Sequence, residues 1–154
     1  MRKDETLYQA MVQKYMNGCC MYLAAALHHK FGYRLGMSTI FDSFSGKETV
    51  YHVWVNLPNK QCLDVTGEQS FEKITAEVKR KYKMAGKRRL SPDEIEARYR
   101  NGTFNEKDFQ YRIYRNVSLK KVERICKRKL PPNRFEVMEG LGVALQFLSK
   151  NWRK

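Results

Sequence analysis

Three side chains of this sequence, Cys20, His52 and Asp64, are of the types that carry out nucleophilic cysteine chemistry. A cysteine nucleophile needs a base that takes its proton, and the same imidazole can later protonate the leaving group. A carboxylate can hold that imidazole in the productive tautomer. The three residues therefore predict a Cys-His-Asp triad, provided that the chain folds so as to bring them together.

Cys20 lies where a glycine turn gives way to an expected helix. Asn17-Gly18 precedes it, and residues 21–31 are apolar and alanine-rich up to Gly32, which predicts a buried helix from about Cys20 to Gly32. Free backbone N–H groups and the positive end of the helix dipole favour a thiolate at such a position. The alternative is that Cys19 and Cys20 are simply small buried side chains.

His52 and Asp64 lie on two segments that are expected to form a β-hairpin. Residues 49–57 are rich in β-branched and aromatic side chains, and residues 61–65 form a shorter strand after the turn at 58–60. A loop at 57–59 would put His52 directly opposite Asp64. A loop at 58–60 would put Asp64 opposite Trp54 and diagonal to His52, still on the same face at about 7–8 Å. A loop of two or four residues would separate the two side chains onto opposite faces.

The motifs around these residues resemble those of papain-like, transglutaminase-type cysteine hydrolases. The matching segments are Gly18 to Leu27, His52-Val53-Trp54-Val55 and Leu63-Asp64-Val65-Thr66-Gly67. They are most similar to small phage and bacterial proteins with the patterns G-x-C-x-x-x-A-x-A-L, H-[VA]-x-V and [YL]-L-D-V-x-G. The resemblance implies an α+β, papain-like fold, in which an N-terminal nucleophile helix packs on a small antiparallel sheet. It covers residues 17–67.

Carried over residue by residue, the resemblance assigns Cys20 as nucleophile, His52 as base and Asp64 as the orienting residue. The relatives often have a histidine directly after the nucleophile, where this chain has Met21. An oxyanion hole would use the backbone N–H of Cys20 and a second donor. Gln13 and Asn17 are candidates for that donor, although Asn17 also suits a helix end or turn.

The charge of the chain is unevenly distributed. Its 154 residues have a net charge of +14, of which residues 1–67 carry +2 (7 basic, 5 acidic) and residues 68–154 carry +12 (23 basic, 11 acidic). We expect a single domain over 1–154, with a catalytic-like α+β core at 1–67 and a basic helical extension at 68–154 packed on it, because the core segment alone is too short to bury much surface.

The remaining pattern predicts mostly helices. Expected helices cover residues 4–16, 70–84, 91–101, 118–130 and 133–152, and a strand covers 35–41. Residues 104–115 are ambiguous, with an alternation at Tyr111, Ile113 and Arg115 that a strand would explain.

Two other functions, metal binding and polyanion binding, can also be considered from the sequence. Cysteine and histidine donors are present, but their spacing matches no standard zinc pattern, so we predict no metal and no cofactor. Basic residues interleaved with aromatic ones predict binding of nucleic acid or of an acidic protein through the C-terminal half. The strongest candidates for polyanion contacts are Lys87, Arg88, Arg89, Lys127, Arg128 and Lys129.

The sequence thus predicts a cysteine-dependent hydrolase or acyltransferase, of the peptidase, amidase, deamidase or transglutaminase-like kind. Its substrate would be a protein or a small acyl donor. The alternative is a non-catalytic binding protein of the same fold that acts through its basic half. No apolar run approaches the ~20 residues of a membrane span, and no secretory signal is expected after Met1. The expected location is the cytoplasm, or that of the host cell if the protein is phage-encoded.

Overall fold

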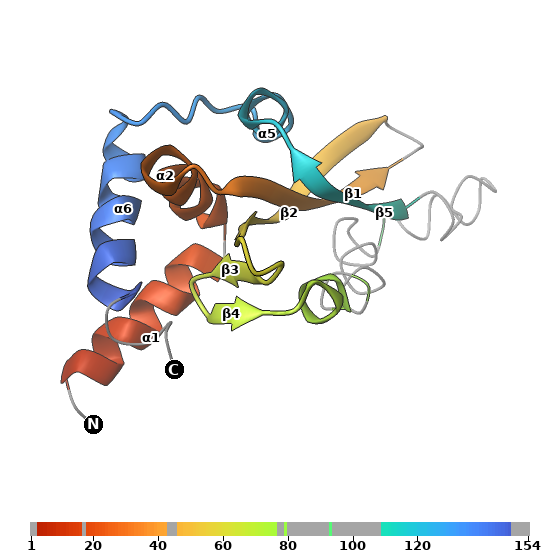
Figure 1. The fold of residues 1–154 in the computed structure, drawn as a ribbon. Coiled ribbons are helices and arrows are strands. Elements are labelled where there is room, and N and C mark those ends of the chain that lie inside the picture. Colours follow the sequence, from red (N-terminus) through yellow and green to blue (C-terminus); the bar gives the residue numbers. More distant parts are fainter. Residues whose placement is uncertain are drawn as a thin grey trace.

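The computed structural model describes residues 3–16, 18–42, 46–76 and 109–148, with residues 79 and 93 besides. In chain order its elements are α1 (Lys3–Met16), α2 (Cys20–Phe31), β1 (Arg34–Asp42), β2 (Lys47–Asn56), β3 (Cys62–Asp64), β4 (Gly67–Gln69), β5 (Phe109–Val117), α5 (Leu119–Cys126) and α6 (Phe135–Leu148) (Figure 1). A further helical segment covers residues 71–76. The fold is α+β, as the sequence predicts.

A single five-stranded sheet, in the order β4-β3-β2-β1-β5, organises these elements. All four neighbouring pairs are antiparallel. The strands β1 to β4 form a meander, and β5 returns from far along the chain to pair with β1. The edge strand β5 and most of the other edge strand, β4, lie in the segment 68–154. The sequence predicts this segment to be a helical extension, but it also contributes to the sheet.

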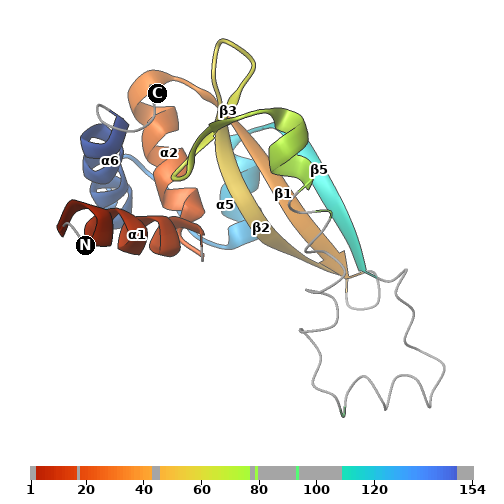
Figure 2. The same ribbon diagram turned by 90° about the horizontal axis from the view of Figure 1, so that it is seen from below.

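Helix α2 forms the centre of the main core. Its residues from Cys20 to Leu27 are all buried, and they share a core cluster with Val53 and Val55 of β2. Helices α1, α2 and α6 lie together beside the sheet (Figure 1) and stay grouped in the perpendicular view (Figure 2). The contact between α2 and α6 is close at Gly140, where a Cβ would lie 3.3 Å from the Tyr22 carbonyl oxygen.

Alternate residues of β2 form a second, smaller core. Trp54 packs with Cys62 and Ile74, whereas its neighbours Val53 and Val55 belong to the α2 core, as the period-two geometry of a strand requires. A Cβ at Gly36, the Cα partner of Trp54, would lie 2.2 Å from the indole nitrogen. Only glycine therefore fits beneath the Trp54 ring.

The predicted helix ends are partly confirmed. Gly32 ends α2 in the left-handed conformation at φ +72°, and the Ser118 side chain accepts a hydrogen bond from Lys121 N at the start of α5. The predicted end of α5 near residue 130 is wrong. The helix ends at Cys126, because Lys127 adopts φ +59° and Arg128 N donates to Glu123 O.

The segment that is ambiguous in the sequence, residues 104–115, contains the start of strand β5 at Phe109. The expected helix at 91–101 and most of that at 70–84 lie outside the described residues. Among the described helices, none is both long and apolar enough to cross a membrane.

Candidate active site

Cys20 is the first residue of α2, as predicted. Gly18 supplies the chain reversal before the helix with φ +103°, a conformation that other residues rarely adopt. Cys19 is the N-cap residue, and its side chain makes no capping hydrogen bond. The first N–H groups of a helix have no intrahelical partner. Cys20 is only 4% exposed. Its thiol therefore lies buried at the N-terminus of a helix that has no side-chain cap.

The β2–β3 hairpin has the second of the two registers that keep His52 and Asp64 on one face. Val55 pairs with Leu63 and Asn56 with Cys62, and Leu57 N donates to Gln61 O across the turn at 2.8 Å. The loop is therefore 58–60, which places Asp64 level with Trp54 and diagonal to His52.

The diagonal arrangement brings the two side chains into direct contact. His52 Nε2 lies 2.8 Å from Asp64 Oδ2, and the two residues are only 6% and 4% exposed. The imidazole ring also lies beside the Trp54 ring, with 6.0 Å between ring centroids. Because Nε2 is used by Asp64, Nδ1 is the nitrogen left to face a nucleophile.

Further hydrogen bonds hold the Asp64 carboxylate. Its Oδ1 accepts hydrogen bonds from the backbone N–H of Thr66 at 2.8 Å and from the Thr66 hydroxyl. Its Oδ2 accepts from Gln69 Nε2 at 3.1 Å as well as from His52. Sequence reasoning missed both supporting residues. Thr66, two residues after the aspartate, fits an Asx-turn and could have been recognised, whereas Gln69 comes from the unpredicted strand β4.

The electrostatics of the site favour a charged imidazole. Burial disfavours the charge and alone lowers the pKa of His52. The hydrogen bond to Asp64 and the electrostatic influence of Cys20 and Asp64 outweigh burial and raise this pKa to about 9. Burial of Asp64 acts to raise its pKa, yet the hydrogen bond and charge of His52, with the bonds from Thr66, lower it overall. Cys20 contributes to the raised pKa, so its side chain lies close enough to His52 to affect the titration of the imidazole.

One buried hydroxyl at the site has no partner. Ser38 is the Cα partner of His52 across β1 and β2. It is 1% exposed, and its Oγ makes no hydrogen bond to any described residue. A β-bulge follows directly, since the register shifts between Ser38 and Thr39.

The structure describes only some of the residues predicted to line the oxyanion hole or to contact polyanions. Gln13 lies in α1 with an exposed side chain, and Asn17 is outside the described residues. Lys87, Arg88 and Arg89 are also outside them. Lys127 and Lys129 are exposed, whereas Arg128 donates to the Tyr22 hydroxyl at 2.9 Å.

Two of the other thiols, those of Cys62 and Cys126, have a pKa above the ordinary value. All four cysteines are free. Burial raises the pKa of Cys62 to about 11, and burial also raises the pKa of Cys126. The two histidines of α2 contact carbonyl oxygens, His28 through Nδ1 to Tyr33 and His29 through Nε2 to Leu130. Within the described ranges, no three His, Cys, Asp or Glu side chains form a group that could hold a metal ion.

Comparisons with protein-family models, with curated proteins and with solved structures find no match to this chain.

Proposed function

We propose that this protein is a cysteine-dependent hydrolase or acyltransferase whose nucleophile is Cys20, with His52 as base and then acid and Asp64 as the orienting residue. The observation that carries the proposal is the buried hydrogen bond of 2.8 Å between His52 Nε2 and Asp64 Oδ2. Cys20 also contributes to the raised pKa of the His52 imidazole. We also propose that the arrangement is papain-like, with the nucleophile helix on an antiparallel sheet.

In the proposed reaction the Cys20 thiolate attacks the carbonyl carbon of an amide or ester. The His52 imidazolium gives its proton to the leaving amine or alcohol, and a thioester to Cys20 remains. Neutral His52 then takes a proton from water or from an amine as that molecule attacks the thioester carbonyl. The bond between the acyl carbon and sulfur breaks, and the Cys20 thiolate and the His52 imidazolium are restored. Water gives hydrolysis or deamidation, and an amine gives transamidation.

Charge develops on the carbonyl oxygen during both attacks. The N–H groups of an uncapped helix N-terminus are suited to stabilise it, because they are oriented before the reaction and lie in surroundings that exclude water. The Cys20 N–H is one such donor. A reducing cytoplasm, the compartment that we propose, would keep the thiol free.

The proposal can be tested before the substrate is known. With p-nitrophenyl acetate as a generic acyl donor, we expect release of nitrophenol and an acetyl group on Cys20, located by mass spectrometry of peptides. Cys20→Ala should abolish both, and His52→Ala should reduce the rate by about 10²-fold or more. Cys126→Ala is the matched control and should react as the wild type does. Equal acetylation of Cys20 and Cys126, independent of His52, would exclude the proposed triad.

The alternative is a binding protein that acts through its basic residues. The exposed side chains of Lys127 and Lys129, in a chain of net charge +14, favour it. It predicts that Cys20→Ala keeps the cellular function, whereas Lys127→Glu with Lys129→Glu abolishes it, and that binding weakens steeply with salt.

A further inference from the structure

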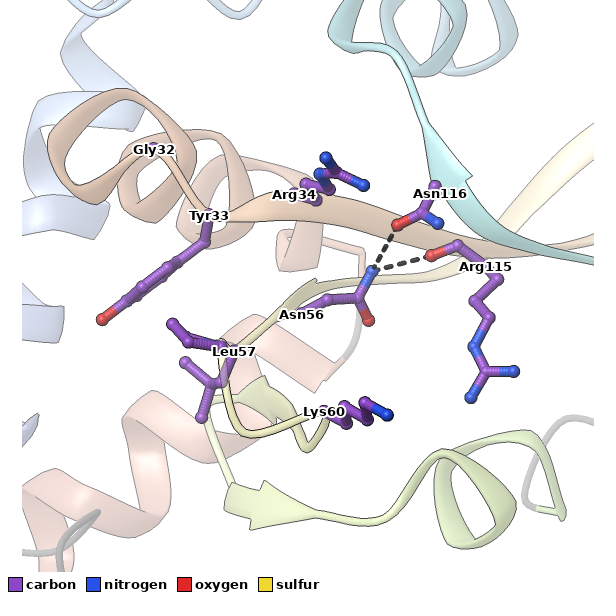
Figure 3. Close-up of a pocket in the computed structure, with 9 residues that line it drawn as sticks. Gly32, Tyr33, Arg34, Asn56, Leu57, Lys60, Arg115 and Asn116 are labelled. Atoms are coloured by element: carbon purple, nitrogen blue, oxygen red, sulfur yellow. Dashed lines mark hydrogen bonds between the residues drawn. The ribbon is translucent and has the colours of Figure 1, made fainter.

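A concave site lies at the other end of α2 from Cys20. It is a cavity of about 660 Å³ between the end of α2, the β2–β3 turn and the end of β5. Its lining includes Tyr33, Arg34, Lys60 and Arg115 (Figure 3). Helix α2 has 12 residues and therefore spans about 18 Å. None of the three triad residues lines this cavity.

Three cations contribute to the cavity from three separate elements. Arg34 begins β1, Lys60 lies in the β2–β3 loop and Arg115 lies near the end of β5, and all three are exposed. No carboxylate of the described chain lies within ion-pair distance of any of them. Because these three cations line one cavity and have no carboxylate partner among the described residues, an anion bound in the cavity would be stabilised.

The position of Arg115 is fixed by contacts on two sides. Its guanidinium carbon lies 4.2 Å from the centroid of the Phe71 ring, and stacking on an aromatic face leaves the in-plane N–H donors free. Its carbonyl oxygen accepts a hydrogen bond of 2.7 Å from Asn56 Nδ2, which is also 3.4 Å from Asn116 Oδ1 (Figure 3). Because Asn116 accepts through its oxygen, its amide N–H₂ remains available as a donor.

The backbone at Lys60 is unusual for its residue type. Lys60 has φ +70°, which glycine or asparagine adopts more easily. The loop therefore holds a lysine where local backbone energetics favour glycine. Departures of this kind concentrate at functional sites.

The number of cations and the size of the cavity define the class of ligand. A single carboxylate would leave most of the positive charge unmatched, whereas a phosphate group brings close to two charges and several acceptor oxygens that suit arginine. A volume of about 660 Å³ is within the range of small-molecule sites and exceeds what one phosphate needs. We propose that this cavity binds a phosphorylated small molecule of about nucleotide size, through Arg34, Lys60 and Arg115.

The experiment is calorimetric titration of the full chain with pyrophosphate, adenosine 5′-monophosphate and adenosine at about 0.15 M salt. We expect both phosphorylated probes to bind and adenosine not to bind. Arg34→Gln with Lys60→Gln should raise both dissociation constants roughly tenfold or more. The matched control, Lys120→Gln with Arg124→Gln, removes two exposed charges of α5 outside the cavity and should change them less than about twofold.

A separate variant guards against effects on folding. Lys60→Gly removes a cation and at the same time suits the positive φ, so it should weaken binding of pyrophosphate while the melting temperature stays equal or rises. Equal weakening by the α5 control would overturn the proposal in favour of diffuse charge, and so would no heat from either phosphorylated probe at millimolar concentration. Cys20→Ala should bind both probes as the wild type does, so this inference and the proposed acyl transfer fail or succeed separately.

Discussion

His52 and Asp64 come from adjacent strands, β2 and β3, and meet diagonally, with 2.8 Å between Nε2 and Oδ2. Both are almost fully buried. A buried charge is costly unless it is paired and hydrogen-bonded, and Asp64 has partners on both oxygens. The site is therefore built to hold a charged imidazole, which a cysteine nucleophile needs to protonate its leaving group.

The first prediction concerns the titration of His52. Because Asp64 and Cys20 outweigh the effect of burial, the pKa of His52 is about 9. Asp64→Asn removes the strongest hydrogen-bond acceptor of the imidazolium together with one negative charge, so we expect the pKa of His52 to fall toward the ordinary value of about 6.5. The measurement is NMR titration of the imidazole signals, assigned with His52→Gln among three histidines. A wild-type His52 that titrates near the ordinary value would contradict the prediction.

The second prediction is the pH dependence of stability. The pKa of His52 is raised from 6.5 to about 9 on folding, so the stabilisation is complete below pH 6.5 and is lost as the pH rises through about 9. The loss should be on the order of 3 kcal/mol. The pKa of Asp64 is lowered by its bonds to His52 and Thr66, which outweigh burial. Its contribution is therefore present above its unfolded value of 3.8 and is lost in acid as the pH falls through the lower folded value.

The measurement is urea unfolding from pH 6 to 10 for the wild type and for His52→Gln. The difference between the two free energies of unfolding should shrink as the pH rises, because groups common to both proteins cancel. A difference that does not change with pH would show that His52 is not charged in the folded protein.

The third prediction concerns Gln69, which donates to Asp64 Oδ2 at 3.1 Å. Gln69→Glu replaces the donor by a second carboxylate, so repulsion should raise the pKa of Asp64 and weaken its bond to His52. We expect Gln69→Glu to reduce the acetylation rate of Cys20 by about tenfold or more and Gln69→Ala to reduce it less. A purely structural role would make Gln69→Ala as harmful as Gln69→Glu, and the NMR titration of His52 would then not move between the two variants.

The sequence could place Cys20 and His52 because both lie in strongly patterned elements, α2 and β2. Alternation in β2 and the apolar run of α2 limit the possible arrangements, and parity leaves only two registers that bring His52 near Asp64. Sequence could not choose between them, because the choice depends on the backbone of the 58–60 loop, where Lys60 adopts a positive φ against its residue type.

Long-range pairing explains most of what the sequence could not predict. Strand β5 pairs with β1 across a long stretch of sequence, and no local pattern encodes such a partner. Strand β4 has only three residues, too few to show alternation, so Gln69 could not be placed beside Asp64. The cavity residues Arg34, Lys60 and Arg115 are likewise far apart in sequence, and the fold of the sheet places them around one cavity.

The fourth prediction tests the packing beneath Trp54, whose ring lies beside His52. A Cβ at Gly36 would come within 2.2 Å of Trp54 Nε1, and the indole cannot move without losing its hydrogen bond of 3.1 Å to Asn56 Oδ1. Gly36→Ala should therefore destabilise the fold by about 3 kcal/mol. It should also slow acetylation of Cys20 in the protein that remains folded, because Trp54 supports the imidazole. The prediction has a matched control in α6, Gly142→Ala, where an added Cβ meets no atom within 4 Å.

Replacing this helical glycine by alanine should stabilise the protein by about 0.5–1 kcal/mol. Chemical denaturation measures both variants, and equal effects of the two substitutions would contradict the close contact between Gly36 and Trp54.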